Sequence, residues 1–265
     1  MLRRGQLTIL GRIRSASNAT FLCESTMGEH RVHCVYKPVA GEQPLWDFPH
    51  GTLAGRELGA YLVSVQLGWD IVPYTIIRDG PAGVGMLQLW VHQPGDALED
   101  ADPAGKPARD LVDLVPAGKV PPGYLPVLRA RDYAGDPVTL VHADDARLRR
   151  VAVLDMLINN ADRKGGHVLR GLDGGVYGVD HGVCLHTEDK LRTVLWGWAG
   201  KPVDAQTLDA VSGLIDALTG PLAAALKPHL TTAEIAALRR RARGLGDYPV
   251  MPSPDRYRAI PWPAF

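Results

Sequence analysis

Residues Asn159–Leu169 read NNADRKGGHVL, and residues Gly178–Gly182 read GVDHG. The first stretch places a carboxylate, Asp162, five residues before a possible metal ligand, His167. The second adds another carboxylate, Asp180, next to an apolar residue typical of a strand. Phosphoryl transfer from ATP uses one Asp to orient a hydroxyl, and a second Asp with a helper ligand to hold Mg²⁺. Each stretch alone is an ordinary polar turn, and only the two together with suitable upstream residues indicate this chemistry.

Composition limits the class of protein. The chain has 265 residues, 46% of them hydrophobic, and its 29 Lys and Arg balance its 29 Asp and Glu. This neutral balance argues against nucleic-acid binding. The three cysteines, Cys23, Cys34 and Cys184, suit a reducing compartment, and neither a signal peptide nor a run of transmembrane length is visible. We therefore expect a cytoplasmic protein with no transmembrane segment.

Strand patterns dominate the first third of the chain. Apolar alternation and turn residues predict strands at residues 7–14, 19–24, 31–36, 71–78 and 85–92. Thr52 is a suitable N-cap for a helix that ends before Gly68. Lys37 lies near the end of the third strand, before Pro38, and Glu57 lies at the edge of the helix's apolar face. Taken alone, both would be ordinary solvated charges.

Helical patterns dominate the rest. Residues 94–144 are rich in Pro, Gly, Ala and Asp, and we expect an irregular connection with one short helix near Arg109–Val115. The remaining expectations are a helix at 145–158, a hairpin at 168–172 and 176–179, and helices at 204–218, 221–226 and 232–245. Strands followed by helices predict an α+β fold with two lobes, residues 1–92 and 93–265.

The loop around Asp162 resembles that of the kinase superfamily. The likeness is to the phosphatidylinositol 3-/4-kinase-related branch, particularly type II phosphatidylinositol 4-kinases, and to HipA-type kinases. These share Asn-x-Asp-Arg with a metal-binding residue five positions after the Asp, here Asn160, Asp162, Arg163 and His167. The Ala-, Gly- and Arg-rich composition also suggests an uncharacterised actinobacterial kinase-like group.

The resemblance implies catalytic and metal-binding roles. Asp162 would orient the attacking hydroxyl, and Lys164 would offset charge on the transferred phosphate. Asp180 would bind Mg²⁺. His167 departs from the family, which usually has Asn there, and imidazole suits Mn²⁺ better. His167 is therefore either a modified ligand for Mg²⁺ or Mn²⁺, a hydrogen-bond partner of the two carboxylates, or not catalytic.

The kinase resemblance also implies an ATP site in the N-terminal lobe. Lys37 would contact the ATP phosphates and Glu57 would be its ion-pair partner. The turn at residues 15–20 would cover the phosphates through Ser15, Ser17 and Asn18, although it lacks a glycine-rich pattern. The segment Leu87–Val91, with Leu89, Trp90 and Val91, would be the hinge that meets adenine.

These expectations define an ATP-dependent kinase acting on a hydroxyl of a protein Ser/Thr, an inositol lipid or a small polyol. A soluble acceptor is slightly favoured because the chain is neutral and has no evident membrane helix. Two alternatives stay open: a nucleotide-binding pseudokinase or scaffold, suggested by His167 and the glycine-poor turn, and a kinase-fold AMP transferase.

Overall fold

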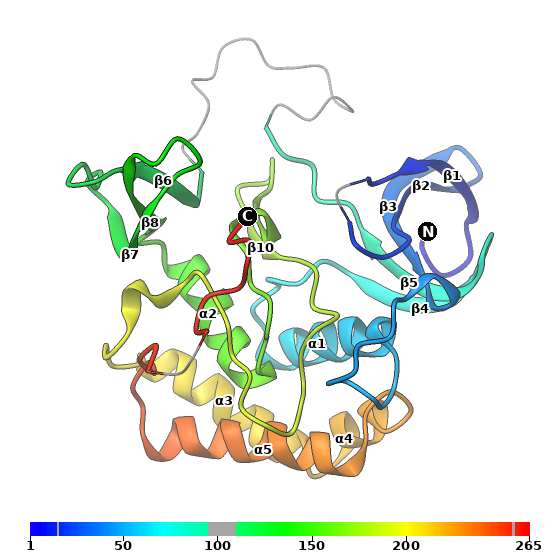
Figure 1. The fold of residues 1–265 in the computed structure, drawn as a ribbon. Helices are drawn as coiled ribbons and strands as arrows, with labels where there is room; N and C mark the ends of the chain where they lie inside the picture. The colour runs from blue at the N-terminus through cyan, green and yellow to red at the C-terminus, as the bar shows by residue number, and fades with distance from the viewer. Residues whose placement is uncertain (15, 95–109, 256–257) are drawn as a thin grey trace.

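A computed structural model describes residues 1–14, 16–94, 110–255 and 258–265 of the chain. In Figure 1 the N-terminal sheet lies on the right, a second, smaller sheet lies at the upper left, and the C-terminal helices run along the bottom. The predicted α+β class is confirmed.

The N-terminal sheet is antiparallel, with strand order β1-β2-β3-β5-β4. Its strands are β1 (Gln6–Arg12), β2 (Phe21–Met27), β3 (His30–Pro38), β4 (Thr75–Gly80) and β5 (Gly83–Leu89). All five predicted strands are confirmed, with shifted ends. Cys23, Cys34 and Tyr36 are fully buried and form a small core of the sheet together with Leu87. Because alternate residues of a strand share a face, this pattern places Lys37 on the face opposite Tyr36.

Helix α1 (Leu53–Leu67) packs against β4 and β5 of this sheet and also against two C-terminal helices, α3 and α4. The Thr52 side chain accepts a hydrogen bond from the Gly55 amide at 2.9 Å, which satisfies one free donor of the first turn. Gly68 ends the helix with a φ of 67°, a left-handed conformation that glycine adopts without strain. The predicted cap, body and end of α1 are all confirmed.

The expectation of an irregular connection was wrong for residues 112–143, whereas residues 95–109 fall outside the described residues. Residues 112–143 form a three-stranded antiparallel sheet of order β6-β8-β7, made of β6 (Val112–Pro116), β7 (Tyr124–Arg131) and β8 (Pro137–Ala143). Of the residues expected to be helical, 112–115 lie on β6, Asp110 and Leu111 precede that strand, and Arg109 falls outside the described residues. The central strand β8 is buried from Val138 to Ala143, so tertiary burial decides its structure, while the Gly and Pro residues occupy the turns.

The helical part begins with α2 (Ala146–Ile158). Asp145 caps the start of α2, and Asn159 ends this helix in a left-handed conformation. The other elements are the hairpin β9 (Val168–Arg170) and β10 (Val176–Gly178), the short 3₁₀ helices η1 (Val39–Gly41), η2 (Gly165–His167) and η3 (Trp196–Trp198), and helices α3 (Ala205–Ala217), α4 (Pro221–Leu226) and α5 (Thr232–Asp247). The predicted helices and hairpin are confirmed.

The largest hydrophobic core runs through α1, α2, α3, α4 and α5, so α1 shares one core with the C-terminal helices. The described part of the chain contains no helix long and apolar enough to cross a membrane.

Candidate active site

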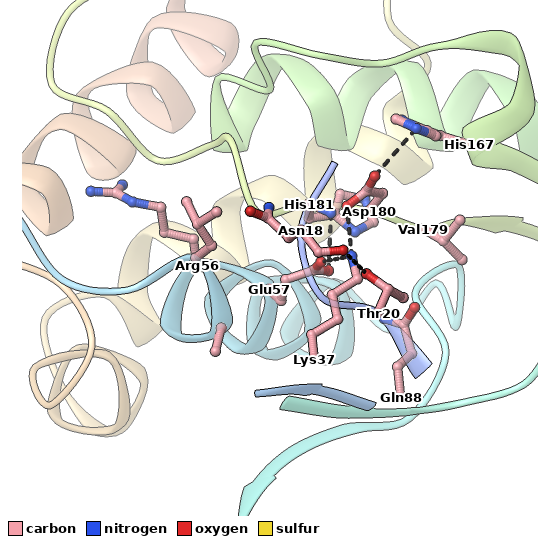
Figure 2. Close-up of polar contacts among 12 residues, drawn as sticks. Asn18, Thr20, Lys37, Arg56, Glu57, Gln88, His167, Val179, Asp180 and His181 are labelled. Carbon is pink, nitrogen blue, oxygen red and sulfur yellow. Dashed lines mark hydrogen bonds and ion pairs between the residues drawn. The ribbon is translucent and has the colours of Figure 1, made fainter. Parts of the chain in front are cut away.

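Lys37 joins three separate parts of the chain. Its Nζ, at the end of β3, donates to Glu57 Oε1 of α1 at 2.6 Å and to Asp180 Oδ1, just after β10, also at 2.6 Å. Figure 2 shows Lys37 reaching both carboxylates. The second Glu57 oxygen accepts the His181 amide at 3.0 Å. Lys37, Glu57 and Asp180, which the resemblance and their order in the sequence singled out, therefore meet at one point.

Burial and charge set the ionisation of this triad. Burial alone would lower the pKa of Lys37, but the carboxylates of Asp180 and Glu57 outweigh it and raise that pKa. The Lys37 charge holds the pKa of Asp180 well below its usual range, while burial raises the pKa of Glu57. The Asp180 side chain is 47% exposed and that of Glu57 1%, so Asp180 is the carboxylate that a ligand can reach.

The loop after α2 presents Asp162 and Lys164 together. The Asn160 side chain accepts the Asp162 amide at 3.0 Å, which fixes the loop's turn. Lys164 Nζ lies 3.4 Å from Asp162 Oδ2. Burial raises the pKa of Asp162, and the nearby Lys164 opposes this rise. The Asp162 side chain is 34% exposed, and the ammonium of Lys164 lies beside it.

His167 connects the two carboxylate loops. Its Nδ1 lies 3.0 Å from the Asp162 carbonyl oxygen, and its Nε2 lies 3.3 Å from Asp180 Oδ2. Burial lowers the pKa of His167 to about 4, so the ring is neutral near pH 7. A carbonyl only accepts hydrogen bonds, so Nδ1 carries the ring proton and Nε2 presents a lone pair to Asp180. The lone pair of His167 Nε2 and the Asp180 Oδ2 oxygen therefore face each other, and a cation between them would bind to both.

A divalent cation fits this pair of donors in part. No group of three or more His, Cys, Asp or Glu side chains suited to a metal ion occurs in the described ranges. A cation held by Asp180 and His167 would therefore need further oxygens from outside the protein. Mg²⁺ is commonly held by one or two carboxylates together with substrate phosphates and water, so this sparse set agrees with a cation that arrives with a nucleotide.

A buried arginine holds the two loops in place. Arg163 and Asp155 are fully buried, and Arg163 Nε donates to Asp155 Oδ2 at 2.9 Å. Its Nη1 donates to the carbonyl oxygens of His167 and Val179, at 2.9 and 2.8 Å. Its Nη2 meets His181 Nε2 at 2.6 Å. One guanidinium thus fixes the backbone on either side of the metal-ligand candidates.

Sequence reasoning identified Arg163 only as part of a motif and missed Asp155. A signal was available, because Asp155 lies three residues after Ala152 and four after Val151, on the apolar face of α2. A carboxylate on a buried helix face needs a partner, and the following loop supplies Arg163.

A cavity of about 220 Å³ opens in front of the triad. The cavity is lined by Lys37, Glu57, Asp162 and Asp180, whereas the candidates Lys164 and His167 are not among its lining residues. A larger cavity of about 380 Å³ lies between α2 and α5, but none of these four residues lines it. The chemistry of the side chains therefore points to the smaller cavity.

The turn between β1 and β2 forms the opposite wall. Ser17 and Asn18 line the cavity as expected, whereas Ser15 lies outside the described residues. Asn18 Oδ1 accepts the Gln43 amide at 2.8 Å, so the turn is tied to the segment after η1. Sequence reasoning missed Glu42, whose carboxylate lines the cavity and accepts amides of the first turn of α1.

The expected hinge is not among the residues lining this cavity. The Leu89 amide donates to the Tyr74 carbonyl at 2.9 Å, and the Trp90 amide donates to the His33 carbonyl at 3.0 Å. Those two amides are therefore engaged within the protein. The structure brings Lys37, Glu57, Asp162, Asp180 and the 17–18 turn together, but does not bring Leu89, Trp90 or Val91 to them.

No protein-family model matches the chain. It is similar to Protein Rv2133c of Mycobacterium tuberculosis, with 73% identity over 265 residues. The similarity covers 100% of this chain and 94% of that relative.

Proposed function

We propose that this chain, which belongs to the family of Protein Rv2133c, is an ATP-dependent phosphotransferase that moves the γ-phosphoryl group to a hydroxyl acceptor. One observation carries the proposal: Lys37, bound to Glu57 and Asp180, shares a cavity with Asp162. A cation for phosphates, a carboxylate for a metal and a carboxylate for a hydroxyl are the groups that this reaction needs.

Lys37 binds the phosphate end of ATP. Glu57 keeps the ammonium charged and directed toward the cavity, and the 17–18 turn covers the phosphates from the other side. Asp180 and His167 would hold Mg²⁺ or Mn²⁺ together with phosphate oxygens. That cation supplies neutralisation of the charge on the phosphates.

Asp162 orients the acceptor. Its carboxylate accepts the hydroxyl proton as the acceptor oxygen bonds to the γ-phosphorus and the bond from that phosphorus to the β–γ bridging oxygen breaks, which releases ADP. The raised pKa of Asp162 makes it a better proton acceptor than an exposed Asp. Lys164, 3.4 Å from Asp162, offsets charge on the transferred group.

The two-lobed arrangement, with lobes 1–92 and 93–265, belongs to this proposal. The origin of the site supports it, since Lys37 and Glu57 come from the first part and Asp162 and Asp180 from the second, although α1 packs into the same core as the C-terminal helices. The acceptor class remains a protein Ser/Thr, an inositol lipid or a small polyol, and the expected cytoplasmic location remains a prediction.

The test is label transfer. Purified protein is incubated with γ-labelled or, separately, α-labelled ATP, with Mg²⁺ or Mn²⁺, and with a cell extract depleted of endogenous kinases. Transfer of γ-label alone, lost in Asp162→Asn and Asp180→Ala, is the expected result, and the labelled fraction identifies the acceptor class. Undiminished transfer in Asp180→Ala would overturn the assignment, and transfer of α-label would indicate AMP transfer.

A pseudokinase is the second candidate, and one contact favours it. Lys37 Nζ lies 2.6 Å from Asp180 Oδ1 and so already occupies one of the two carboxylate oxygens of the proposed metal ligand Asp180. ATP binding without any transfer of label would support this alternative.

A further inference from the structure

The segment 258–265 returns to the catalytic loop (Figure 1, where the end marked C lies beside β10). The Ala259 carbonyl accepts the Thr193 amide at 3.0 Å and Trp196 Nε1 at 2.9 Å. Farther along, the Ala264 carbonyl accepts the Gly165 amide at 2.8 Å. Gly165 lies three residues after Asp162 and begins η2, so this last bond reaches the candidate catalytic loop directly.

Phe265 lies against the backbone of Gly165. A Cβ added at residue 165 would be 2.4 Å from Phe265 Cε1 and 2.6 Å from its Cδ1. At such distances a side chain added at residue 165 would have to displace the Phe265 ring, which is itself 48% exposed. Trp262, three residues earlier in the same segment, is 91% exposed and makes a matched control.

The same segment supports the loop from a second direction. The Arg163 amide donates to the Arg192 carbonyl, and the Val194 amide donates to the Arg163 carbonyl, so residues 192–194 run beside the loop. Thr193, in the middle of that stretch, is held by Ala259. Residues 259–265 therefore brace both the loop and the strand-like stretch beside it.

We propose that Ala264 and Phe265 are positioning residues: they hold the Asp162–His167 loop in the conformation in which Asp162 can orient the acceptor hydroxyl. The role in catalysis rests on the proposed function, because it supposes that Asp162 orients an acceptor. The Arg163 side chain holds the loop by its bonds to Asp155 and to the His167 carbonyl, and the Phe265 ring lies against Gly165 between them in the sequence of the loop. Small displacements of a catalytic group lower turnover strongly, whereas the ATP-binding residue Lys37 lies on another element.

The kinetic test compares Phe265→Ala with Trp262→Ala in the full-length protein. Phe265→Ala should lower kcat by about tenfold or more, leave the Kd for ATP within about twofold, and be largely restored by Phe265→Leu. Trp262→Ala should leave both constants unchanged. Equal kcat values in the two Ala variants would overturn the proposal.

A second measurement needs no activity: amide hydrogen exchange of the full-length protein, followed in a proteolytic fragment that covers residues 161–167. Phe265→Ala should speed exchange at the Gly165 amide, while Trp262→Ala should not, with equal thermal melts showing that both remain folded. Unchanged exchange in Phe265→Ala would refute the bracing role. Wild-type protein without any label transfer would refute the proposed function instead, and exchange would still decide whether the segment braces the loop.

Gly165→Ala provides a reciprocal test. The added methyl group should displace the Phe265 ring and speed exchange as Phe265→Ala does. Combining both substitutions should add little to either alone, because they disrupt the same contact. Fully additive effects would mean that residues 165 and 265 act independently.

Discussion

Replacing Arg163 with Met should remove a large share of the protein's stability. The Arg163 and Asp155 side chains are both 0% exposed, and the guanidinium also serves the carbonyls of His167 and Val179. Without it, the buried Asp155 carboxylate keeps the side-chain Nδ2 of Asn160 as a donor but loses its counter-charge. Breaking a buried ion pair from one side costs about 3–5 kcal/mol. A domain's whole free energy of unfolding is about 5–15 kcal/mol.

Urea unfolding followed by tryptophan fluorescence measures this loss. The control is Arg31→Ala, whose partner Glu24 is 3.9 Å away and whose own side chain is 72% exposed. That variant should change the free energy of unfolding by less than about 1 kcal/mol. A loss as small as this for Arg163→Met would refute the reasoning.

The double variant Arg163→Met, Asp155→Leu tests the cause. Removing both charges abolishes the uncompensated buried carboxylate, so the double variant should be more stable than Arg163→Met alone. If the double variant were the less stable of the two, the loss would come from the carbonyl contacts and packing rather than from the ion pair.

Three further predictions concern the site itself. Asp162→Asn should bind ATP with a Kd close to that of wild type yet transfer no label, which binding titration and the transfer assay check together; weakened ATP binding would contradict the acceptor role. His167→Asn should raise activity with Mg²⁺ relative to Mn²⁺, and an unchanged ratio would exclude His167 from the metal's ligands. The free energy of unfolding should fall on acidification. Burial lowers the pKa of folded His167 to about 4, against about 6.5 in the unfolded chain. The unfolded chain therefore takes up the proton first below pH 6.5, and the free energy of unfolding should be lower by about 3 kcal/mol at pH 4. Urea unfolding at several pH values should show a shallower decline in His167→Asn; equal slopes would contradict this.

The parts of the fold that local chemistry determines were predictable. Thr52 and Gly68 delimit α1 because capping and left-handed backbone are properties of single residues. The sheet at 112–143 was missed for the opposite reason. Its first strand pairs with the last, β6 with β8, and its Gly and Pro residues suggest a loop unless that long-range pairing is known.

The site divides in the same way. Lys37, Glu57, Asp162 and Asp180 could be selected from the kinase resemblance and their order along the chain, because Lys37 and Glu57 lie on a predictable strand and helix and the two Asp residues follow such elements. The partners that hold them could not, since the contact of Phe265 with Gly165 spans a hundred residues and carries no periodic signal. A glycine in a polar turn predicts flexibility, whereas here it marks a close contact.

The junction at Lys37 also has a consequence for how the chain folds. Its partner Asp180 is 143 residues away, so this contact closes a very long loop. Such contacts form late, because their loop-closure entropy must be offset by structure already present. While the chain is synthesised, Lys37 and Glu57 emerge long before Asp180. The N-terminal sheet can therefore form first, but its Lys37 acquires the Asp180 carboxylate as a partner only when the last third of the protein packs against the sheet.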